Sequence, residues 1–297
     1  MAAIEAAVLE VPTQHRLLLG DARRASLPAG SVHLIVTSPP YWTLKEYRRA
    51  DGQLGWIADY EEFLSQLDQV WRTCHAALVP GGRLICVVGD VCLARRRNRG
   101  KHTVVPLHAS IQEHCREIGF DNLAPIVWSK IANAAYEMER GAGGFLGKPY
   151  EPNAVIKNDI EFILMQRKGG YRRPDLSARI LSLLSESSFK RFFRQIWTDI
   201  PGESTRDHPA PYPVALADRL IRMFSFVGDT VLDPFNGTAT TQVAAAACGR
   251  NSIGIEVDPV YFADALDRLR RESGGLLSTA HVSTGEVGTH NGLPATA

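Results

Sequence analysis

The tetrapeptide Ser38, Pro39, Pro40 and Tyr41 places two hydrogen-bond acceptors where they cannot move. Each proline fixes its own φ angle and restricts the residue before it, so the Ser38 hydroxyl and the Pro39 carbonyl are held in place. Two fixed acceptors suit an exocyclic amine, which offers two N–H donors. Tyr41 adds a face for a flat ring to stack on, with Trp42 beside it. For the tetrapeptide alone, a turn that merely caps a strand is the alternative.

An aromatic amine held in this way becomes a better nucleophile. Its lone pair is normally delocalised into the ring, and acceptors for both N–H groups favour a more tetrahedral nitrogen. That nitrogen can attack an electrophilic methyl group without a covalent enzyme intermediate, because positioning and electrostatics supply the catalysis.

A second motif, VLDPFNGTATT at 231–241, is typical of a strand, a turn and the start of a helix. Gly237 lets the backbone approach a ligand, and we expect Thr238 to cap the helix, whose N–H groups then face the strand ends. Glu256 ends the next apolar run, roughly twenty residues on, and a carboxylate there can accept both hydroxyls of a ribose. The pair indicates a nucleoside cofactor. A βαβ unit with a polar strand end is the alternative, since no full GxGxxG occurs.

Apolar runs that alternate with amphipathic ones must position these motifs. They predict an α/β domain with a mainly parallel sheet, which binds ligands at the carboxyl ends of its strands. The expected strands are 16–20, 32–38, 83–90, 124–130, 161–167, 229–235 and 251–257, and the expected helices are 59–79, 104–118, 213–225, 238–248 and 259–271.

Three segments depart from this alternation. Residues 131–158 are glycine-rich and are expected to form a long loop. Residues 167–207 carry many arginines among aromatic residues, and 94–101 hold five basic residues and no acid. Residues 273–297 are rich in Gly, Ser and Thr and lack periodicity, so we expect a disordered tail.

Composition sets broad limits. The chain has 297 residues, 45% hydrophobic and 22% charged, with a net charge of +1, which is ordinary for a globular protein. Its five cysteines form no CxxC and no zinc-like set, so we expect buried thiols and no metal. The N-terminus lacks a basic signal region and no apolar run reaches membrane-spanning length, so we expect a cytoplasmic protein without a membrane partner.

The two motifs, in this order, resemble the amino-methylating DNA methyltransferases that use S-adenosyl-L-methionine, in the permuted arrangement called the β class. Further segments resemble that family along most of the chain: 17–42, 78–90, 158–169, 208–235 and 253–269. The resemblance implies a Rossmann-like fold in which 1–166 form the catalytic half, 167–207 the target-recognition segment and 208–272 the cofactor half. Ala239 stands where the family usually has a second glycine.

The resemblance also implies roles for particular residues. Ser38 and the Pro39 carbonyl would hold the target amine, Pro40 would set the elbow and Tyr41 would stack on the base. The cofactor-binding residues would be Asp21, Asp233, Pro234, Phe235, Gly237, Thr238, Glu256 and His208. Among them, Glu256 would take the ribose, and Asp21 would either approach the adenine end or serve as a plain turn aspartate.

The identity of the target base depends on the first residue of the tetrapeptide. In this family Ser is usual for N4 of cytosine, and Asp or Asn for N6 of adenine, so Ser38 favours cytosine and adenine is the alternative. Methylation at carbon 5 needs a cysteine nucleophile in a Pro-Cys context, which the chain lacks. Enzymes acting on RNA or on protein amides place the cofactor loop first, and a non-catalytic DNA-binding protein would not need an intact tetrapeptide.

Double-stranded DNA is the expected partner, with the target base flipped out of the duplex. The expected DNA contacts are Arg95, Arg96, Arg97, Arg172, Arg173, Lys190, Arg191 and Arg194. Family habit adds a cognate restriction endonuclease as a further partner. The recognition sequence and the oligomeric state stay open.

Overall fold

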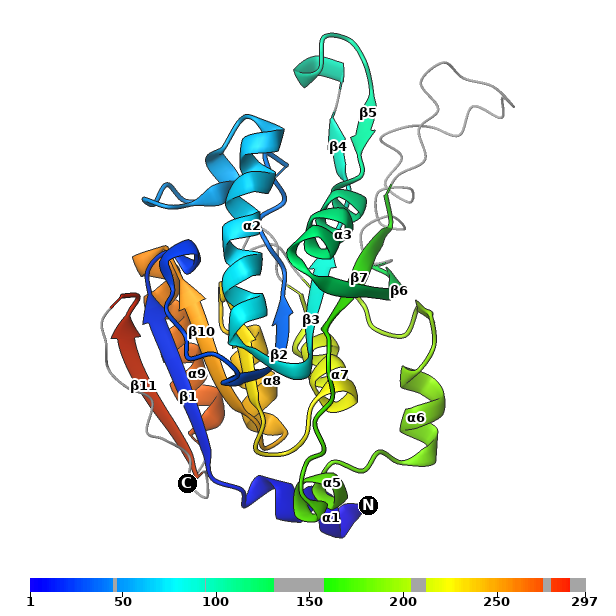
Figure 1. Cartoon of the computed structure of the whole chain (residues 1–297), viewed down its shortest axis with the longest axis vertical. Coiled ribbons are helices and arrows are strands. Elements are labelled where there is room, and N and C mark those ends of the chain that lie inside the picture. The colour runs from blue at the N-terminus through cyan, green and yellow to red at the C-terminus, as the bar shows by residue number, and fades with distance from the viewer. Residues whose placement is uncertain (45–46, 94, 131–157, 204–211, 275–278, 289–297) are drawn as a thin grey trace.

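A single nine-stranded sheet forms the centre of the molecule (Figure 1). The computed structural model describes residues 1–44, 47–93, 95–130, 158–203, 212–274 and 279–288. Within these ranges the strand order is β11-β1-β10-β9-β2-β3-β7-β6-β8, and β7 is the one strand antiparallel to its neighbours. The strands are β1 Thr13–Leu19, β2 Val32–Thr37, β3 Leu78–Val88, β6 Phe120–Ser129, β7 Ile160–Lys168, β8 Ile196–Trp197, β9 Thr230–Asp233, β10 Asn251–Glu256 and β11 Ala280–Glu286. The predicted mainly parallel α/β sheet is confirmed.

Strands from the two ends of the chain are neighbours in this sheet. β9 and β10, late in the sequence, lie between β1 and β2, and β2 pairs with β9 through Leu34–Val231 and Ile35–Leu232. Because parallel strands point the same way, β2 and β9 end at the same edge. The proline elbow after β2 and the loop after β9 are therefore close in space although they lie far apart in sequence.

Helices cover both faces of the sheet (Figure 1). Alternate residues of the central strands point to opposite faces, as Ile35 and Leu84 do toward one core, and Leu34 and Ile85 toward the other. α2 and α3 complete the first core, and α7 and α8 the second, with α9 packed beside α8. Their bounds are α2 Tyr60–Ala77, α3 Leu107–Ile118, α7 Val214–Phe224, α8 Thr240–Ala247 and α9 Pro259–Ser273.

Aspartate caps start two of these helices. The Asp59 carboxylate accepts from the backbone N–H of Glu62 at 2.8 Å, where α2 begins. Asp258 accepts from Val260 N at 2.7 Å, and Pro259 takes the first helical position of α9, where its missing N–H costs nothing. Both caps fix where a helix leaves the edge of the sheet that carries the two motifs.

Smaller elements lie at the two ends of the sheet. A hairpin of β4 Val91–Leu93 and β5 Thr103–Val105 projects beyond the carboxyl end of β3 and carries the basic segment at its tip (Figure 1). At the opposite end lie α1 Ala2–Leu9 and α5 Leu176–Leu181, with α6 Glu186–Phe192 at the sheet's side. No helix in the described ranges is both long and apolar enough to cross a membrane. The loop expected at 131–158 lies outside the described residues, apart from its last residue.

The expectation of a disordered tail from 273 is wrong for part of that segment. Ser273 still belongs to α9, and β11 pairs in parallel with β1 over its whole length. β11 was missed because an edge strand needs few apolar side chains, since backbone hydrogen bonds hold it to its neighbour. Val282 is the residue of β11 that packs against a hydrophobic core.

Candidate functional site

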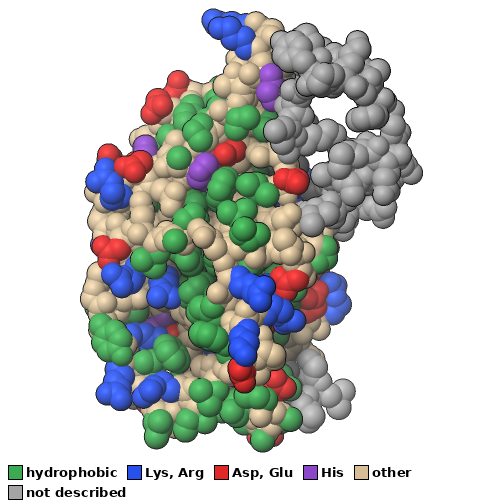
Figure 2. Space-filling view, turned by 90° about the vertical axis from the view of Figure 1, so that its right-hand side faces the viewer, with side chains coloured by type: hydrophobic (Ala, Val, Ile, Leu, Met, Phe, Trp, Pro, Cys, Tyr) green, Lys and Arg blue, Asp and Glu red, His purple; other side chains and the backbone are tan. Residues whose placement is uncertain are grey.

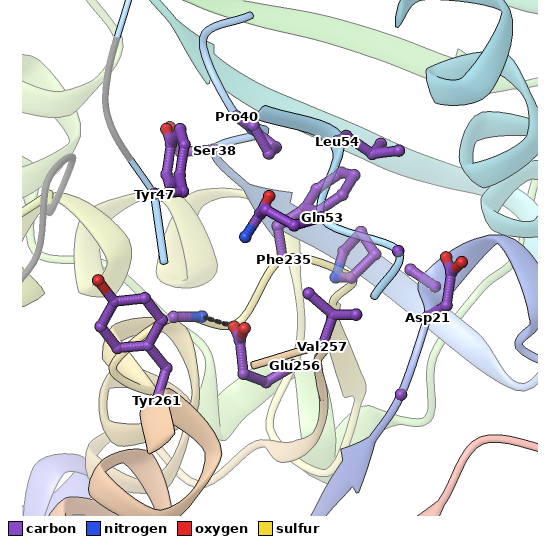
Figure 3. Close-up of a pocket in the computed structure, with 15 residues that line it drawn as sticks. Asp21, Ser38, Pro40, Tyr47, Gln53, Leu54, Phe235, Glu256, Val257 and Tyr261 are labelled. Carbon is purple, nitrogen blue, oxygen red and sulfur yellow. Dashed lines mark hydrogen bonds between the residues drawn. The ribbon is translucent and has the colours of Figure 1, made fainter. Parts of the chain in front are cut away.

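A pocket opens where β1, β2, β9 and β10 end, at the edge of the sheet where ligands bind in α/β folds (Figure 3). Residues from both motifs line it. Of the expected site residues it brings together Asp21, Ser38, Pro40, Pro234, Phe235, Gly237 and Glu256. Pro39, Tyr41, Asp233 and Thr238 do not line it, and His208 lies outside the described residues.

Glu256 presents a carboxylate to this pocket from the end of β10. Its Oε2 accepts from the backbone N–H of Gly237 at 2.7 Å, and its Oε1 from that of Asp258 at 2.9 Å. Burial raises the pKa of Glu256 from 4.5 to about 7. Each oxygen keeps a lone pair, so the fixed carboxylate can accept two further hydrogen bonds, as a ribose diol requires.

Asp233 joins neighbouring segments by hydrogen bonds and does not line the pocket. The buried carboxylate accepts from Thr37 Oγ1 at 2.7 Å, Thr241 Oγ1 at 2.6 Å, Phe235 N at 3.0 Å and Tyr212 OH at 3.1 Å. Burial raises its pKa. These bonds tie the last residue of β2 to the loop after β9 and to α8, so they set the distance between the elbow and the cofactor loop. Asp233, expected among the residues that line the cofactor site, does not line the pocket, because its carboxylate is hydrogen-bonded within the protein.

Thr238 does not cap α8, contrary to expectation. The helix begins at Thr240, and its N-cap is Ala239 in the left-handed conformation, with φ of +64°. Thr238 instead accepts from Arg268 Nη1, through its carbonyl at 3.1 Å and its hydroxyl at 3.2 Å. Ala239 thus adopts a conformation that favours glycine, the residue usual here in the family that the sequence resembles.

The elbow itself differs in one respect from the expected arrangement. Ser38 and Pro40 face the pocket, but the Tyr41 side chain is buried and belongs to the core. Ser38 Oγ donates to the Tyr41 hydroxyl at 3.1 Å, and Tyr41 N donates to the Tyr47 hydroxyl at 3.3 Å. Tyr41 therefore orients the Ser38 hydroxyl, and its ring offers no open face for a base to stack on in this structure.

Asp21 is a turn aspartate that also lines the pocket. Its carboxylate caps the 3₁₀ turn Ala22–Arg24 by accepting from Arg23 N at 2.9 Å, and it also lines the pocket. An ion pair with Arg23 holds the side chain. Gly52 lies against it, since a Cβ there would meet Asp21 Oδ2 at 3.0 Å.

Sequence reasoning missed one wall of the pocket. Gln53 and Leu54 close it opposite Glu256, with Tyr47 and Tyr261 at its side (Figure 3). The segment before Gln53 has no helical or strand periodicity, so nothing in the sequence drew attention to it. Tyr261, one turn into α9, could have been found, because helices that follow strands begin at the ligand-binding edge.

A second polar cluster at the same edge was also missed. Lys130 Nζ pairs with the buried Glu161 at 2.7 Å, across the end of β6 and the start of β7. Beside them the His108 ring stacks on Phe162 with centroids 3.8 Å apart, and its Nδ1 lies 2.6 Å from Asp90 Oδ1. Since neighbouring strands are about 4.8 Å apart and β3 lies between them, β7 lies about 10 Å from β2.

The expected DNA contacts fall into three groups. Arg95, Arg96 and Arg97 form the 3₁₀ turn at the tip of the β4–β5 hairpin, beyond the carboxyl end of β3. The second group, Lys190, Arg191 and Arg194, lies on or next to α6, beside the β8 edge.

Arg172 and Arg173 form the third group, which lies at the other end of the sheet from the elbow. Arg172 pairs with Asp229, just before β9, and so lies at the amino ends of the parallel strands. β2 has six residues, which span about 20 Å, so this pair is about one strand length from the elbow. The sequence could not show this, because basic composition does not reveal at which end of a sheet a segment lies.

No group of three or more metal-ligating side chains occurs in the described residues. The five cysteines are free, and burial raises the pKa of Cys74 and Cys86. Cys74 and Cys86 are packing residues rather than nucleophiles.

Comparisons with known proteins agree with the geometry. The family model described as DNA methylase, of the N6 and N4 type, matches residues 32–267. The type II methyltransferase M.MjaI of Methanocaldococcus jannaschii is 36% identical, over 84% of this chain and 89% of its own. The type II methyltransferase M.BglI of Bacillus subtilis is 47% identical, over 82% of each chain.

A solved structure adds the fold and a ligand. It is the putative DNA modification methylase of Thermus thermophilus complexed with S-adenosyl-L-methionine, 52% identical, with a TM-score of 0.72 over 91% of this chain and 99% of that one. The family match covers far more than half of the chain, and its two motifs meet at one edge of the sheet. The chain belongs to the N6/N4 family of DNA methyltransferases.

Proposed function

We propose that this S-adenosyl-L-methionine-dependent DNA methyltransferase methylates N4 of a cytosine that has been flipped out of duplex DNA. The observation that carries the proposal is the position of Ser38, an alcohol at the first place of the elbow, in the wall of the cofactor pocket. N6 of adenine is the alternative, because it too is an exocyclic amine that two acceptors can hold.

The residues around the pocket suit the cofactor. Glu256, fixed by two backbone amides, would accept the ribose hydroxyls. The Phe235 ring, packed edge-on against Trp71 with centroids 6.0 Å apart, supplies an apolar wall. When bound, S-adenosyl-L-methionine supplies an electrophilic methyl group.

The hydrogen bond from Ser38 to Tyr41 explains how the elbow works. Since the Ser38 proton points to the Tyr41 hydroxyl, both lone pairs of Ser38 Oγ are free to accept an N–H of the target amine. The Pro39 carbonyl would accept the second N–H. Tyr41 is then a positioning residue rather than a stacking platform, and the amine nitrogen is held with its lone pair toward the cofactor.

The DNA would lie along the carboxyl edge of the sheet. The β4–β5 hairpin extends from this edge, so its arginines are placed to contact phosphates beside the flipped base. The Lys130–Glu161 pair and His108 would form the far wall of the base pocket. Because M.MjaI and M.BglI are named type II methyltransferases, we also propose that this enzyme acts in a restriction–modification system.

Methyl transfer from labelled cofactor tests the activity. Duplex DNA, structured RNA and a peptide mixture would be offered separately to the full chain. We expect label in duplex DNA alone. Label in RNA or peptide but not in DNA would contradict the proposal, and cofactor binding without transfer to any of the three would indicate a non-catalytic DNA-binding protein.

A further inference from the structure

A large open groove lies at the end of the molecule opposite the cofactor pocket. It is lined by the turn before Arg83 in β3, the segment 170–184 with α5, the α6 residues Phe189 and Phe193, and 222–226 at the end of α7. His33, the second residue of β2, is at its floor, whereas Ser38 follows the other end of that strand. The groove is therefore about 20 Å from the elbow and is no extension of the catalytic site.

The groove is strongly basic. Among the residues that the structure describes, no aspartate or glutamate lines it, but six arginines do: Arg83, Arg167, Arg172, Arg173, Arg179 and Arg222. Three of them have acidic partners: Arg167 pairs with the exposed Asp121, Arg172 with the buried Asp229 and Arg222 with the half-buried Asp218. Arg83, Arg173 and Arg179 form no ion pair with any residue that the structure describes.

Arg83 is the residue that most clearly lacks a partner. It faces Arg167 directly across the β3–β7 pairing, so two cations lie opposite each other. Its guanidinium lies over the Phe224 ring, 4.9 Å from the centroid. Its Nε is buried and donates to no acceptor within the described part of the chain. A guanidinium without an acidic partner favours an anion seated beside it in the groove.

Large apolar side chains surround these arginines. Six of the thirteen large hydrophobic residues exposed in the described chain line the groove: Tyr171, Leu176, Ile180, Leu183, Phe189 and Phe193. Tyr171 is 82% exposed, and the Phe189 and Phe193 rings stack on each other at 4.6 Å. Figure 2 shows such apolar and basic side chains together on the lower half of the face it presents. Clustered exposure of this kind marks an interaction site.

We propose that this groove docks an acidic segment of a partner protein, with carboxylates on the arginines and large apolar side chains among the exposed rings and leucines. Arginine with aromatic residues is the composition of protein interfaces. A protein fits better than a nucleic acid because half of the apolar lining is aliphatic, which neither stacks on bases nor contacts phosphates. Duplex DNA held at the elbow also lies at the other end of the sheet.

Fluorescence anisotropy on the full chain tests the proposal. The probe is a short labelled peptide of alternating glutamates and leucines or phenylalanines, compared with a peptide in which lysine replaces each glutamate. We expect the acidic probe to bind and the basic one not to. Arg179→Glu and Arg83→Gln should each weaken binding about tenfold or more, the loss expected for one charge-assisted hydrogen bond. Phe189→Ser should weaken it as well.

Arg72→Glu is the matched control, because Arg72 is exposed on α2 and does not line the groove. It should bind the acidic probe like the unmodified protein, and Arg179→Glu should keep its melting temperature and its methyl transfer. Absence of acidic-probe binding, or equal binding by Arg179→Glu and the unmodified chain, would overturn the proposal. The proposal would also be overturned if duplex DNA displaced the probe and bound Arg179→Glu more weakly than the unmodified chain, since the groove would then be a nucleic-acid surface.

Discussion

At the scale of single residues, two side chains control the proposed chemistry by how they are held. The Ser38 hydroxyl is oriented by Tyr41, and the Glu256 carboxylate by the amides of Gly237 and Asp258. Asp233 holds neither ligand, yet its four hydrogen bonds fix the elbow against the cofactor loop. Precise placement of this kind is what positional catalysis depends on.

Ser38→Ala should lose turnover while it keeps the cofactor. Removing one acceptor that acts on the reacting amine is expected to reduce the single-turnover rate by roughly a hundredfold or more. Cofactor affinity, measured by calorimetry, should stay within about twofold, because the variant removes no cofactor contact proposed here. Ser31→Ala, on an exposed turn, is the control. Full turnover in Ser38→Ala would refute the elbow mechanism.

Cofactor binding should depend on pH through Glu256. Ribose hydroxyls donate, so binding needs the carboxylate, and with a pKa of about 7 the ionised fraction rises about tenfold between pH 6 and 8. The cofactor Kd should fall by about that factor over this range, and Glu256→Gln should abolish the dependence. A Kd that does not change with pH in the unmodified protein would contradict this role.

Protonation of Glu256, which should weaken cofactor binding, stabilises the folded protein. Because the folded-state pKa lies above the unfolded value, the folded protein binds the proton more tightly between pH 4.5 and about 7. This group's contribution to the free energy of unfolding therefore falls as pH rises through that window, and levels off above it. Urea unfolding without cofactor should show a smaller fall in Glu256→Gln.

At the scale of elements, substitutions at the start of α8 should change stability, and substitutions in the β4–β5 hairpin should change DNA affinity. Ala239 is fully buried in the left-handed conformation, where its methyl group packs near Leu17 and Val243. The hairpin, by contrast, makes few contacts with the body and carries exposed cations. One element therefore bears on stability and the other on DNA affinity.

Substitutions at Ala239 should separate strain from packing. Glycine relieves the left-handed strain but loses a buried methyl group, and each effect is about 1 kcal/mol, so Ala239→Gly should change the free energy of unfolding by less than about 1 kcal/mol. Ala239→Val combines a β-branched side chain at positive φ with overpacking and should cost about 3 kcal/mol or more. Urea unfolding measures both, and equal effects of the two variants would contradict this explanation.

The hairpin should contribute salt-dependent DNA affinity. Arg96 and Arg99 are exposed at its tip. Each phosphate contact contributes about 0.9 to the slope of log affinity against log salt, so Arg96→Ala with Arg99→Ala should lower that slope by roughly 2. Arg72→Ala with Arg270→Ala, exposed on α2 and α9, is the control and should leave the slope unchanged. An unchanged slope in the hairpin variant would show that the hairpin does not contact DNA.

At the scale of the whole molecule, the sheet separates the proposed catalytic site from the proposed docking groove. Its carboxyl edge holds the elbow, the cofactor pocket and the basic hairpin, and its amino edge holds the arginine groove. A net charge of only +1 conceals this arrangement, because acidic residues behind the groove balance several of its arginines.

Sequence reasoning succeeded where chemistry is local. Proline geometry pointed to the elbow, and strand and helix periodicity located the sheet and the helices α2, α3, α7, α8 and α9. It failed where the direction of a side chain depends on tertiary packing, since no local sequence pattern shows that the Asp233 carboxylate and the Tyr41 ring are buried. It also failed for β11, which backbone pairing holds, and it could not show at which end of the sheet Arg172 lies, because that depends on the chain's path.

The central claim is that the Ser38 elbow methylates N4 of cytosine. The most direct test incubates the full chain with labelled S-adenosyl-L-methionine and mixed-sequence duplex DNA, digests the product to nucleosides and identifies the labelled one. The account predicts label in N4-methylcytosine, and its loss in Ser38→Ala. Label in N6-methyladenine without N4-methylcytosine would contradict it.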